Sequence, residues 1–283
     1  MEIEEKLRKT KLIVFDLDGT LLNDNSTIGT KTKELISELQ IKNVHFSFAT
    51  GRLHSAVISY AEELNIKSPL ISLDGCLIKN YPEEKVLFES YLKKKHVLKA
   101  IEFSEKFLLN LALCCSDAIY YTENNSVIPQ ILDKYGARYE EVASFNGYTD
   151  KVLEIVFAGD NKEIMKFVAG RMDFPYTLGI NTSYFKSQRH GGIYYLEIRR
   201  KGSSKKTGLF RLLKHFKLKI YEAAVLGDWY NDITLFQTDA LKVALANAVP
   251  EIKKYADILL EKNNNEDGAG EFLEMILNAK NGK

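Results

Sequence analysis

Two apolar runs that end abruptly in acid constrain the fold of this chain more than any other feature. KLIVFD (11–16) and AAVLGD (223–228) are almost entirely apolar up to a terminal aspartate. Continuous apolar runs of this length are typical of strands that are buried on both faces, as in a parallel sheet. We therefore expect a parallel sheet with carboxylates at the carboxyl ends of its strands.

Strand-like and helix-like segments alternate around both runs. The N-terminal third continues with a helical pattern at 30–43, a second strand at 44–49 and a second helix at 53–65. Near the C-terminus, a helical pattern at 206–218 precedes the strand at 223–228. Strand–helix–strand order places helices on both faces of a parallel sheet. The predicted fold class is therefore α/β, a doubly wound, Rossmann-like parallel sheet.

The middle of the chain has a different pattern. It contains two runs rich in β-branched and aromatic residues, KVLEIVFAGD (151–160) and GGIYYLEIRR (191–200), with amphipathic helices before and between them. No strand there ends in an acidic motif of the DLD type. We therefore predict an α+β domain at 83–189, inserted into a core domain formed by 1–82 and 190–283.

The composition favours a small-molecule partner. The formal net charge of +1 on 283 residues gives no general attraction to nucleic acid or anionic membranes. No run approaches the roughly 20 apolar residues of a membrane helix, and the first ten residues are too charged for a signal peptide. Three cysteines, an odd number, suit a reducing compartment. We expect a cytoplasmic protein without a nucleic-acid or membrane partner, and the oligomeric state stays open.

Polar segments follow several of the predicted strands. Ligands of open parallel sheets collect at the carboxyl ends of the strands, where FDLDGT (15–20), FATGR (48–52) and GDWYND (227–232) would lie. Asp16 and Asp228 end different strands and would face each other. Carboxylates of one sign are tolerated together when a divalent cation binds between them. Hard oxygen ligands favour Mg²⁺.

The neighbouring groups suit phosphate. Thr50 and the Gly51 amide would lie at a strand-to-helix junction, which is a natural anion site. Lys205, in KGSSKKTG (201–208), would add a positive point charge. Carboxylates, metal, hydroxyl, amide and ammonium together match phosphoryl transfer. One carboxylate can act as nucleophile, and a second can donate and accept the proton.

These motifs carry a family resemblance. DLDGT, ATGR, KGSSK and GDWYND resemble, in the same order, the four motifs of haloacid dehalogenase (HAD) superfamily phosphatases. The chain is similar to the Cof-type branch, whose large α/β cap is inserted between the second and third motifs. The resemblance implies a Mg²⁺-dependent hydrolase that removes phosphate from small metabolites, with sugar phosphates foremost, through an aspartyl-phosphate intermediate. It also implies that the inserted domain is a cap that sets substrate specificity.

The resemblance assigns a role to each motif residue. Asp16 would be the nucleophile and Asp18 the general acid and base. Mg²⁺ would be held by Asp16, Asp228 and the backbone carbonyl of Asp18. Asp232 would orient the lysine or a metal-bound water, and Arg52 would brace its loop. Phosphate binding is implied for five residues: Leu17, Thr50, Gly51, Lys205 and Asn231.

Departures from the family pattern leave alternatives open. Asp74 stands where the branch usually has asparagine, and adds negative charge near the site. Lys206 replaces the glycine that usually follows the motif lysine, so Lys205 and Lys206 both remain candidates. The same motifs also fit a sugar phosphomutase. A non-catalytic protein that binds or senses phosphorylated ligands is a further alternative, although all four motifs are chemically intact.

Other polar segments receive structural interpretations. KKKH at 93–96 is typical of a solvated helix face. AGDN at 158–161 imitates the last motif but lacks its second acid, which indicates a turn. The neighbouring Cys114 and Cys115 are interpreted as small buried thiols.

Overall fold

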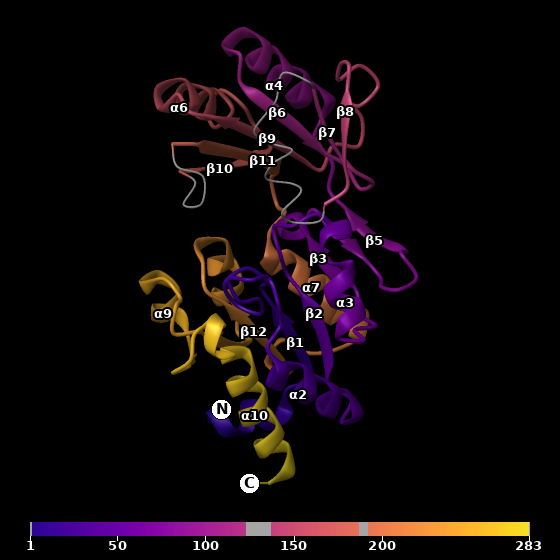
Figure 1. Cartoon of the computed structure of the whole chain (residues 1–283), viewed down its shortest axis with the longest axis vertical. Helices are drawn as coiled ribbons and strands as arrows, with labels where there is room; N and C mark the ends of the chain where they lie inside the picture. Colours follow the sequence, from indigo (N-terminus) through magenta and orange to yellow (C-terminus); the bar gives the residue numbers. More distant parts are fainter. Residues whose placement is uncertain (1, 123–136, 187–191, 283) are drawn as a thin grey trace. The chain divides into compact units, whose positions relative to one another are not determined.

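The computed structural model describes residues 2–122, 137–186 and 192–282, and the chain divides into two compact units (Figure 1). The first unit comprises Met1–Gly51, Ile58–Leu87 and Ser204–Lys283. The second comprises Arg52–Val57 and Phe88–Ser203.

The predicted domain boundaries differ from this division. The predicted crossing at 82/83 precedes the change of unit at Leu87/Phe88. The predicted return to the core at residue 190 lies outside the described residues, and the chain re-enters the first unit only at Ser204. The reason is strand β11 (Tyr194–Arg200), which pairs with β9 (Glu154–Gly159) in the sheet of the second unit. An apolar run alone does not reveal which sheet a strand joins.

The first unit is built on a five-stranded sheet in the order β14-β13-β12-β1-β2. Its pairings are parallel throughout, which confirms the predicted fold class. Every residue of β1 is buried, as its continuous apolar run predicts. The strands are β1 (Leu12–Phe15), β2 (His45–Phe48), β12 (Ala223–Gly227), β13 (Leu241–Ala244) and β14 (Ile258–Leu259).

Helices cover both faces of this sheet. From the central pair β1 and β12, the chain moves outward in opposite directions to β2 and to β13, so right-handed crossovers put α2 and α8 on opposite faces. Helix α10 packs beside α2 (Figure 1), and α7 contacts α8. The helices are α1 (Ile3–Lys9), α2 (Thr30–Ile41), α3 (Ile58–Glu63), α7 (Lys205–Phe216), α8 (Ile233–Phe236), α9 (Pro250–Tyr255) and α10 (Gly268–Asn281).

A small three-stranded sheet follows β2 along the chain. Its order is β3-β4-β5, with bounds Leu70–Ser72, Leu77–Lys79 and Val86–Glu89. The Thr50 amide donates to the carbonyl of Ile71 (3.0 Å), so the end of β2 adjoins β3. Four short 3₁₀ helices complete the described connections of the first unit: η2 (Leu73–Gly75), η3 (Ile220–Glu222), η4 (Tyr230–Asp232) and η5 (Asn264–Glu266). A further one, η1 (His54–Ala56), belongs to the second unit.

The second unit is a six-stranded mixed sheet in the order β10-β11-β9-β6-β7-β8, with two described helices on one face (Figure 1). Its central pairings are antiparallel, and β7 and β8 are parallel. The predicted α+β character is therefore present. The remaining bounds are α4 (Lys94–Phe107), β6 (Asn110–Cys114), β7 (Ile119–Thr122), β8 (Tyr139–Val142), α6 (Lys162–Arg171) and β10 (Ile180–Lys186).

Alternation along the strands gives this sheet two different faces. Ile155 and Phe157 of β9 belong to the apolar core under α4 and α6. Glu154, one residue earlier, points to the other face. There the guanidinium of Arg199 lies 2.6 Å from the Glu154 carboxylate and 2.8 Å from that of Glu197. One face thus supplies the hydrophobic core, and the other carries a buried ionic cluster.

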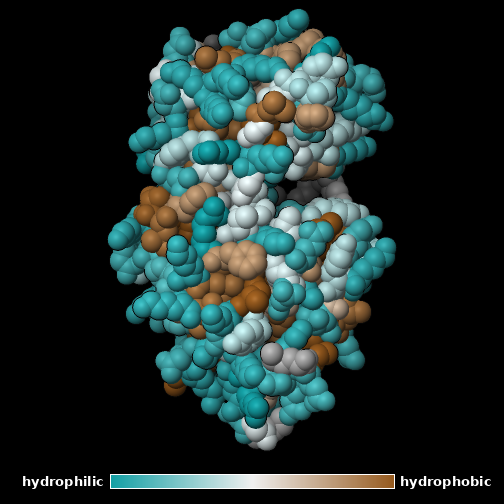
Figure 2. Space-filling model, turned by 180° about the vertical axis from the view of Figure 1, so that it is seen from behind, coloured by the Kyte–Doolittle hydropathy of each residue, from teal (hydrophilic) through white to brown (hydrophobic). Residues whose placement is uncertain are grey.

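The thiols are buried, as predicted, and one face of the molecule (Figure 2) is mainly hydrophilic. On the face shown in Figure 2, hydrophilic residues dominate and hydrophobic residues form small separate groups. Cys76, Cys114 and Cys115 are free and buried, which confirms that the neighbouring pair consists of buried thiols. Every helix of the described residues is too short or too polar to cross a lipid bilayer.

Candidate active site

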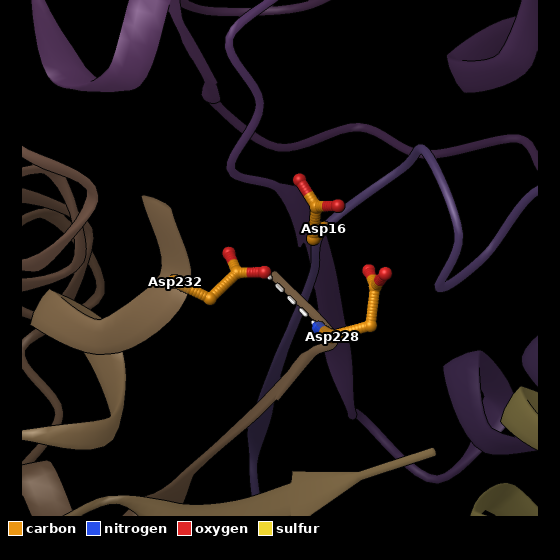
Figure 3. A group of neighbouring side chains, drawn as sticks. All are labelled: Asp16, Asp228 and Asp232. Carbon is orange, nitrogen blue, oxygen red and sulfur yellow. Dashed lines mark hydrogen bonds between the residues drawn. The ribbon is translucent and has the colours of Figure 1, made fainter. Parts of the chain in front are cut away.

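Three aspartates of the first unit gather at the carboxyl edge of the parallel sheet (Figure 3). Asp16 directly follows β1 and Asp228 directly follows β12, and because these strands pair in parallel, both carboxylates emerge at one edge. Asp232, at the end of η4, joins them. One carboxylate oxygen of each residue lies within 4.8 Å of the others, and all three residues are buried. The structure brings together the two strand-end aspartates that the sequence singles out and adds Asp232.

Lys205 is the cation of this cluster. Its side chain is fully buried at the first turn of α7, and its Nζ lies 2.5 Å from Oδ1 of Asp16 and 2.7 Å from Oδ1 of Asp232. Burial alone would lower the pKa of Lys205, but the two carboxylates outweigh burial and raise it above its usual value. The ammonium therefore stays charged. Lys206 instead donates to the carbonyl of Gln237 (3.2 Å), so the structure brings Lys205, not Lys206, to the aspartates.

The carboxylate of Asp232 is saturated by the protein. Oδ1 accepts from Lys205, and Oδ2 accepts from the backbone amides of Asp228 (3.1 Å) and Trp229 (3.2 Å), the first of which is dashed in Figure 3. The spacing of four residues in GDWYND lets the side chain reach back to the start of its own loop. Asp232 therefore fixes both the lysine and the backbone that carries Asp228, and its supporting role in a reaction stays a prediction.

Gly19 and Thr20 shape the surroundings of Asp228. The Thr20 hydroxyl, which is 1% exposed, donates to Oδ1 of Asp228 (2.7 Å). Gly19 has a φ of +83°, and a Cβ there would lie 2.5 Å from Oδ2 of Asp228. Sequence reasoning did not single out either residue, although both stand in DLDGT. The sequence signal that could have identified them is their position directly after the strand-end acids, where a tight turn favours glycine and a carboxylate needs a donor.

The cluster carries more negative than positive charge. Burial raises the pKa of Asp16 well above its ordinary range, against the opposing effect of Lys205 and together with the charges of Asp232 and Asp228. Burial, with the charge of Asp232, also raises the pKa of Asp228 to about 7. Among the described residues, no donor reaches Oδ2 of Asp16 or Oδ2 of Asp228. Asp16 and Asp228 thus each have a free carboxylate oxygen, in a cluster whose three residues can each offer one ligand oxygen within 4.8 Å of the others. Such a set fits a hard divalent cation such as Mg²⁺, which would also favour ionisation.

A second set of groups surrounds the end of β2. Thr50 is buried, and its carbonyl accepts from the amide of Asp74 (2.9 Å). The Asp74 carboxylate lies 3.4 Å from Nδ2 of Asn231 and 3.7 Å from the position of a Cβ on Gly51. Asp74 therefore links two segments, 48–52 and 227–232, that the sequence assigns to phosphate binding. It does so in a left-handed conformation (φ 46°), which Asp tolerates better than most residues.

Leu17, Asp18 and Arg52 occupy different settings. The Leu17 side chain is fully buried and its carbonyl accepts from the Leu22 amide (2.9 Å), so its own N–H is the group left for an anion. Asp18 is half-buried, and its negative charge contributes to the raised pKa of Asp228. Arg52 belongs to the second unit, so its implied bracing role stays a prediction.

The sequence as a whole places the chain in a family. A family model for haloacid dehalogenase-like hydrolases matches residues 13–273. The chain belongs to this family. A protein of Mycoplasma genitalium is 29% identical, over 94% of this chain and 98% of its own. Phosphatase YwpJ of Bacillus subtilis is 27% identical, over 94% of this chain and all of its own.

Solved structures of haloacid dehalogenase-like hydrolases share the fold. One from Bacteroides thetaiotaomicron superposes with a TM-score of 0.82 at 26% identity, covering 94% of this chain and 99% of its own. The resemblance inferred from the four motifs is therefore confirmed for the chain as a whole. The match spans both units, so the second unit is part of what the family shares.

Proposed function

We propose that this haloacid dehalogenase-like hydrolase is a Mg²⁺-dependent phosphatase of small phosphorylated metabolites, sugar phosphates foremost. The observation that carries the proposal is the buried cluster of Asp16, Asp228, Asp232 and Lys205, with its two free carboxylate oxygens. The similarity to phosphatase YwpJ supports the reaction class. Sugar phosphates are proposed because the motifs resemble those of the Cof-type branch.

The residues present fit a magnesium ion. Asp16 and Asp228 would each supply a carboxylate oxygen, and Asp18 its backbone carbonyl. When bound, the ion would neutralise negative charge on the phosphoryl group and on the carboxylates. Both carboxylate oxygens of Asp232 accept hydrogen bonds from the protein. We therefore propose that Asp232 holds Lys205 and the Asp228 loop and does not bind the metal.

Asp16 would attack first. One oxygen of the Asp16 carboxylate would form a bond to phosphorus while the bond from phosphorus to the ester oxygen breaks, and Lys205, which donates to Oδ1, would hold the carboxylate in place. Asp18 would give its proton to the departing oxygen, so the alcohol leaves neutral. The product of this step is an aspartyl phosphate on Asp16.

Water would complete the cycle. Asp18, now ionised, would take a proton from a water molecule whose oxygen bonds to phosphorus, and the bond between phosphorus and Asp16 would break. Inorganic phosphate is released, and both aspartates return to their starting states. Through both steps, Lys205, the Thr50 hydroxyl and the amides of Leu17 and Gly51 would hold the phosphoryl oxygens.

Phosphate release from p-nitrophenyl phosphate tests the proposal, with and without Mg²⁺. We expect Asp16→Asn to lower kcat by at least about a thousandfold, because an amide oxygen is a poor nucleophile. Asp239→Asn is the matched control, since Asp239 is exposed and lies outside the cluster. Full activity in Asp16→Asn would refute the aspartyl-phosphate route. Conversion of a hexose 1-phosphate to its 6-phosphate, without free phosphate, would indicate the mutase instead.

A further inference from the structure

The second unit contains a cavity of about 310 Å³ that the proposed reaction does not use. It is lined by Lys95, His96 and Lys99 of α4 and by residues 175–178, all of which belong to the second unit. The volume is at the lower end of the range for small-molecule sites. The lining residues include two ammonium groups and an imidazole, and no acid.

His96 presents a polar atom without a partner. The residue is only 3% exposed, and its Nδ1 makes no hydrogen bond within the described part of the chain. Buried polar atoms are nearly always paired, so the unpaired nitrogen of a residue that lines the cavity is an exception that a bound ligand or water would explain. Burial and the nearby lysines lower the pKa of His96. A neutral imidazole can still donate one hydrogen bond to an anion.

The start of α4 concentrates positive charge. The helix begins at Lys94, its N-cap Lys93 makes no side-chain capping bond, and its first turn holds no acid. The positive end of the helix dipole therefore coincides with lysines. Lys94 lies 3.2 Å from the carboxylate of Asp150. Lys95 is exposed, and the described residues offer it no ion-pair or hydrogen-bond partner. A negatively charged ligand could therefore pair with Lys95 and accept a hydrogen bond from His96.

The opposite wall of the cavity is already held in place. Nζ of Lys99 donates to the carbonyl of Arg171 (2.8 Å) and to the hydroxyl of Thr177 (2.7 Å). Next to Thr177, Tyr176 and Leu178 are 60% and 66% exposed. The Arg171 guanidinium lies 4.3 Å from the Tyr176 ring centroid, which adds a further positive charge. The cavity thus has a cationic end and an apolar, aromatic side.

We propose that this cavity binds the phosphoryl group of a small phosphorylated metabolite. Lys95 and the imidazole of His96 contact the phosphoryl oxygens, and Tyr176 packs against the carbon skeleton of the ligand. Lys99 acts as a positioning residue that fixes the wall. None of the described residues that line the cavity is a carboxylate or a cysteine, so the ligand is bound and not hydrolysed there. The inference does not depend on the proposed function, because the aspartate cluster belongs to the first unit.

Binding can be observed at His96 itself. The full chain, labelled with ¹⁵N and free of Mg²⁺, is titrated with inorganic phosphate and with glucose 6-phosphate while its imidazole NMR signals are recorded. His96→Asn identifies the His96 signals among the five histidines. We expect a saturable shift of the His96 signals and none at His45, which stacks on Phe216 in the first unit. Chloride at equal ionic strength should leave His96 unchanged.

Matched lysine variants distinguish specific phosphate binding in the cavity from nonspecific attraction to a positively charged surface. Lys95→Gln should weaken phosphate binding about tenfold, as expected for loss of a charge-assisted hydrogen bond. Lys94→Gln, one residue away and paired with Asp150, should change binding less than about twofold. Tyr176→Ala should weaken glucose 6-phosphate but not inorganic phosphate. Absence of a saturable His96 shift, an equal shift with chloride, or an unchanged affinity in Lys95→Gln would overturn the proposal.

Discussion

Two lysines, one in each unit, show how differently the units handle positive charge. Lys205 is fully buried against two carboxylates, which raise its pKa despite burial. Lys99 is half-buried against a carbonyl and a hydroxyl, and burial together with the charge of Arg171 lowers its pKa. The same side chain is therefore stabilised as a cation in the first unit and is disfavoured as a cation in the second.

The surroundings of the two lysines explain this difference. In the first unit, the ammonium of Lys205 contacts two of three clustered carboxylates, those of Asp16 and Asp232, so ionisation of all three leaves negative charge that a metal ion can balance. In the second unit, the described residues that line the cavity include cations and no acid, so their lining retains positive charge that an anion can balance. The two regions are suited to ligands of opposite sign.

The largest effect is expected from Lys205→Met. It leaves the buried carboxylates of Asp16 and Asp232 without their cation, and breaking a buried ion pair in this way costs about 3–5 kcal/mol. We expect the free energy of unfolding in urea to fall by that amount without Mg²⁺. Phosphatase activity should fall by about a thousandfold, because the phosphoryl charge is no longer neutralised.

Lys206→Met is the control for this variant. Its ammonium reaches only the Gln237 carbonyl, so stability should change by less than about 1 kcal/mol and activity by less than about threefold. Equal losses in both variants would show that the charge balance around Asp16 does not depend on Lys205.

A smaller effect is expected from the combination of pH and Mg²⁺. The pKa of Asp228 is about 7 in the folded chain, and its ordinary value is 3.8. Between these values, the metal-free folded state holds a proton that the unfolded chain has lost, so this carboxyl makes the free energy of unfolding fall as pH rises. Mg²⁺ requires the ionised form, so saturating Mg²⁺ should raise Tm by roughly 5–10 °C at about pH 8 and by less at about pH 5.

Thermal melts of Asp228→Asn check the origin of that pH dependence. The variant lacks the titrating carboxyl, so the difference between the two pH values should shrink and the Mg²⁺ effect should weaken. A Tm increase by Mg²⁺ that is the same at both pH values in the unmodified protein would contradict the expectation.

Lys99→Met tests the comparison between the two lysines in the second unit. The substitution removes two hydrogen bonds to neutral acceptors, and no carboxylate loses its ion-pair partner. We expect a loss of roughly 1–2 kcal/mol in urea unfolding. Hydrolysis of p-nitrophenyl phosphate should change by less than about twofold. A loss as large as that in Lys205→Met would mean that the sign of the neighbouring charges is not what separates the two sites.

The smallest effect is expected from Asp74→Asn. The substitution removes a negative charge beside Asn231 but keeps an acceptor for its amide and a residue that tolerates φ 46°. KM for a dianionic sugar phosphate should fall about threefold, with kcat nearly unchanged. An increase in KM would show that the carboxylate contacts substrate hydroxyl groups instead of repelling the phosphate.

The sequence predicted the parts of the site that depend on strand ends. KLIVFD and AAVLGD each combine an apolar strand with a terminal acid, and parallel pairing then brings Asp16 and Asp228 together. The choice between Lys205 and Lys206 was not predictable, because both stand in one basic segment. The structure brings Lys205 to the cluster because it occupies the first helical position after the N-cap Ser204.

The second unit was less predictable. The segment at 93–96 was interpreted as a solvated helix face, which is correct for the three lysines and wrong for His96, which is buried. A run of three lysines hides the helical period, so the inward-facing fourth residue carries no visible signal. The sheet that β11 joins could not be predicted either, since a run such as YYLEIRR is compatible with the sheet of either unit.

The arrangement of Ser204 has a consequence for exchanging the second unit between relatives. The chain re-enters the first unit at Ser204, whose side chain accepts from the Thr207 amide (3.2 Å) and thereby caps α7 one residue before Lys205. A chimera spliced after Ser203 would keep the recipient's own helix cap and lysine, whereas a splice a few residues later would transplant both. The donor would also have to supply Arg52–Val57, which belongs to the second unit. Thirty residues of the first unit, Ile58–Leu87, separate this short segment from the rest of the second unit.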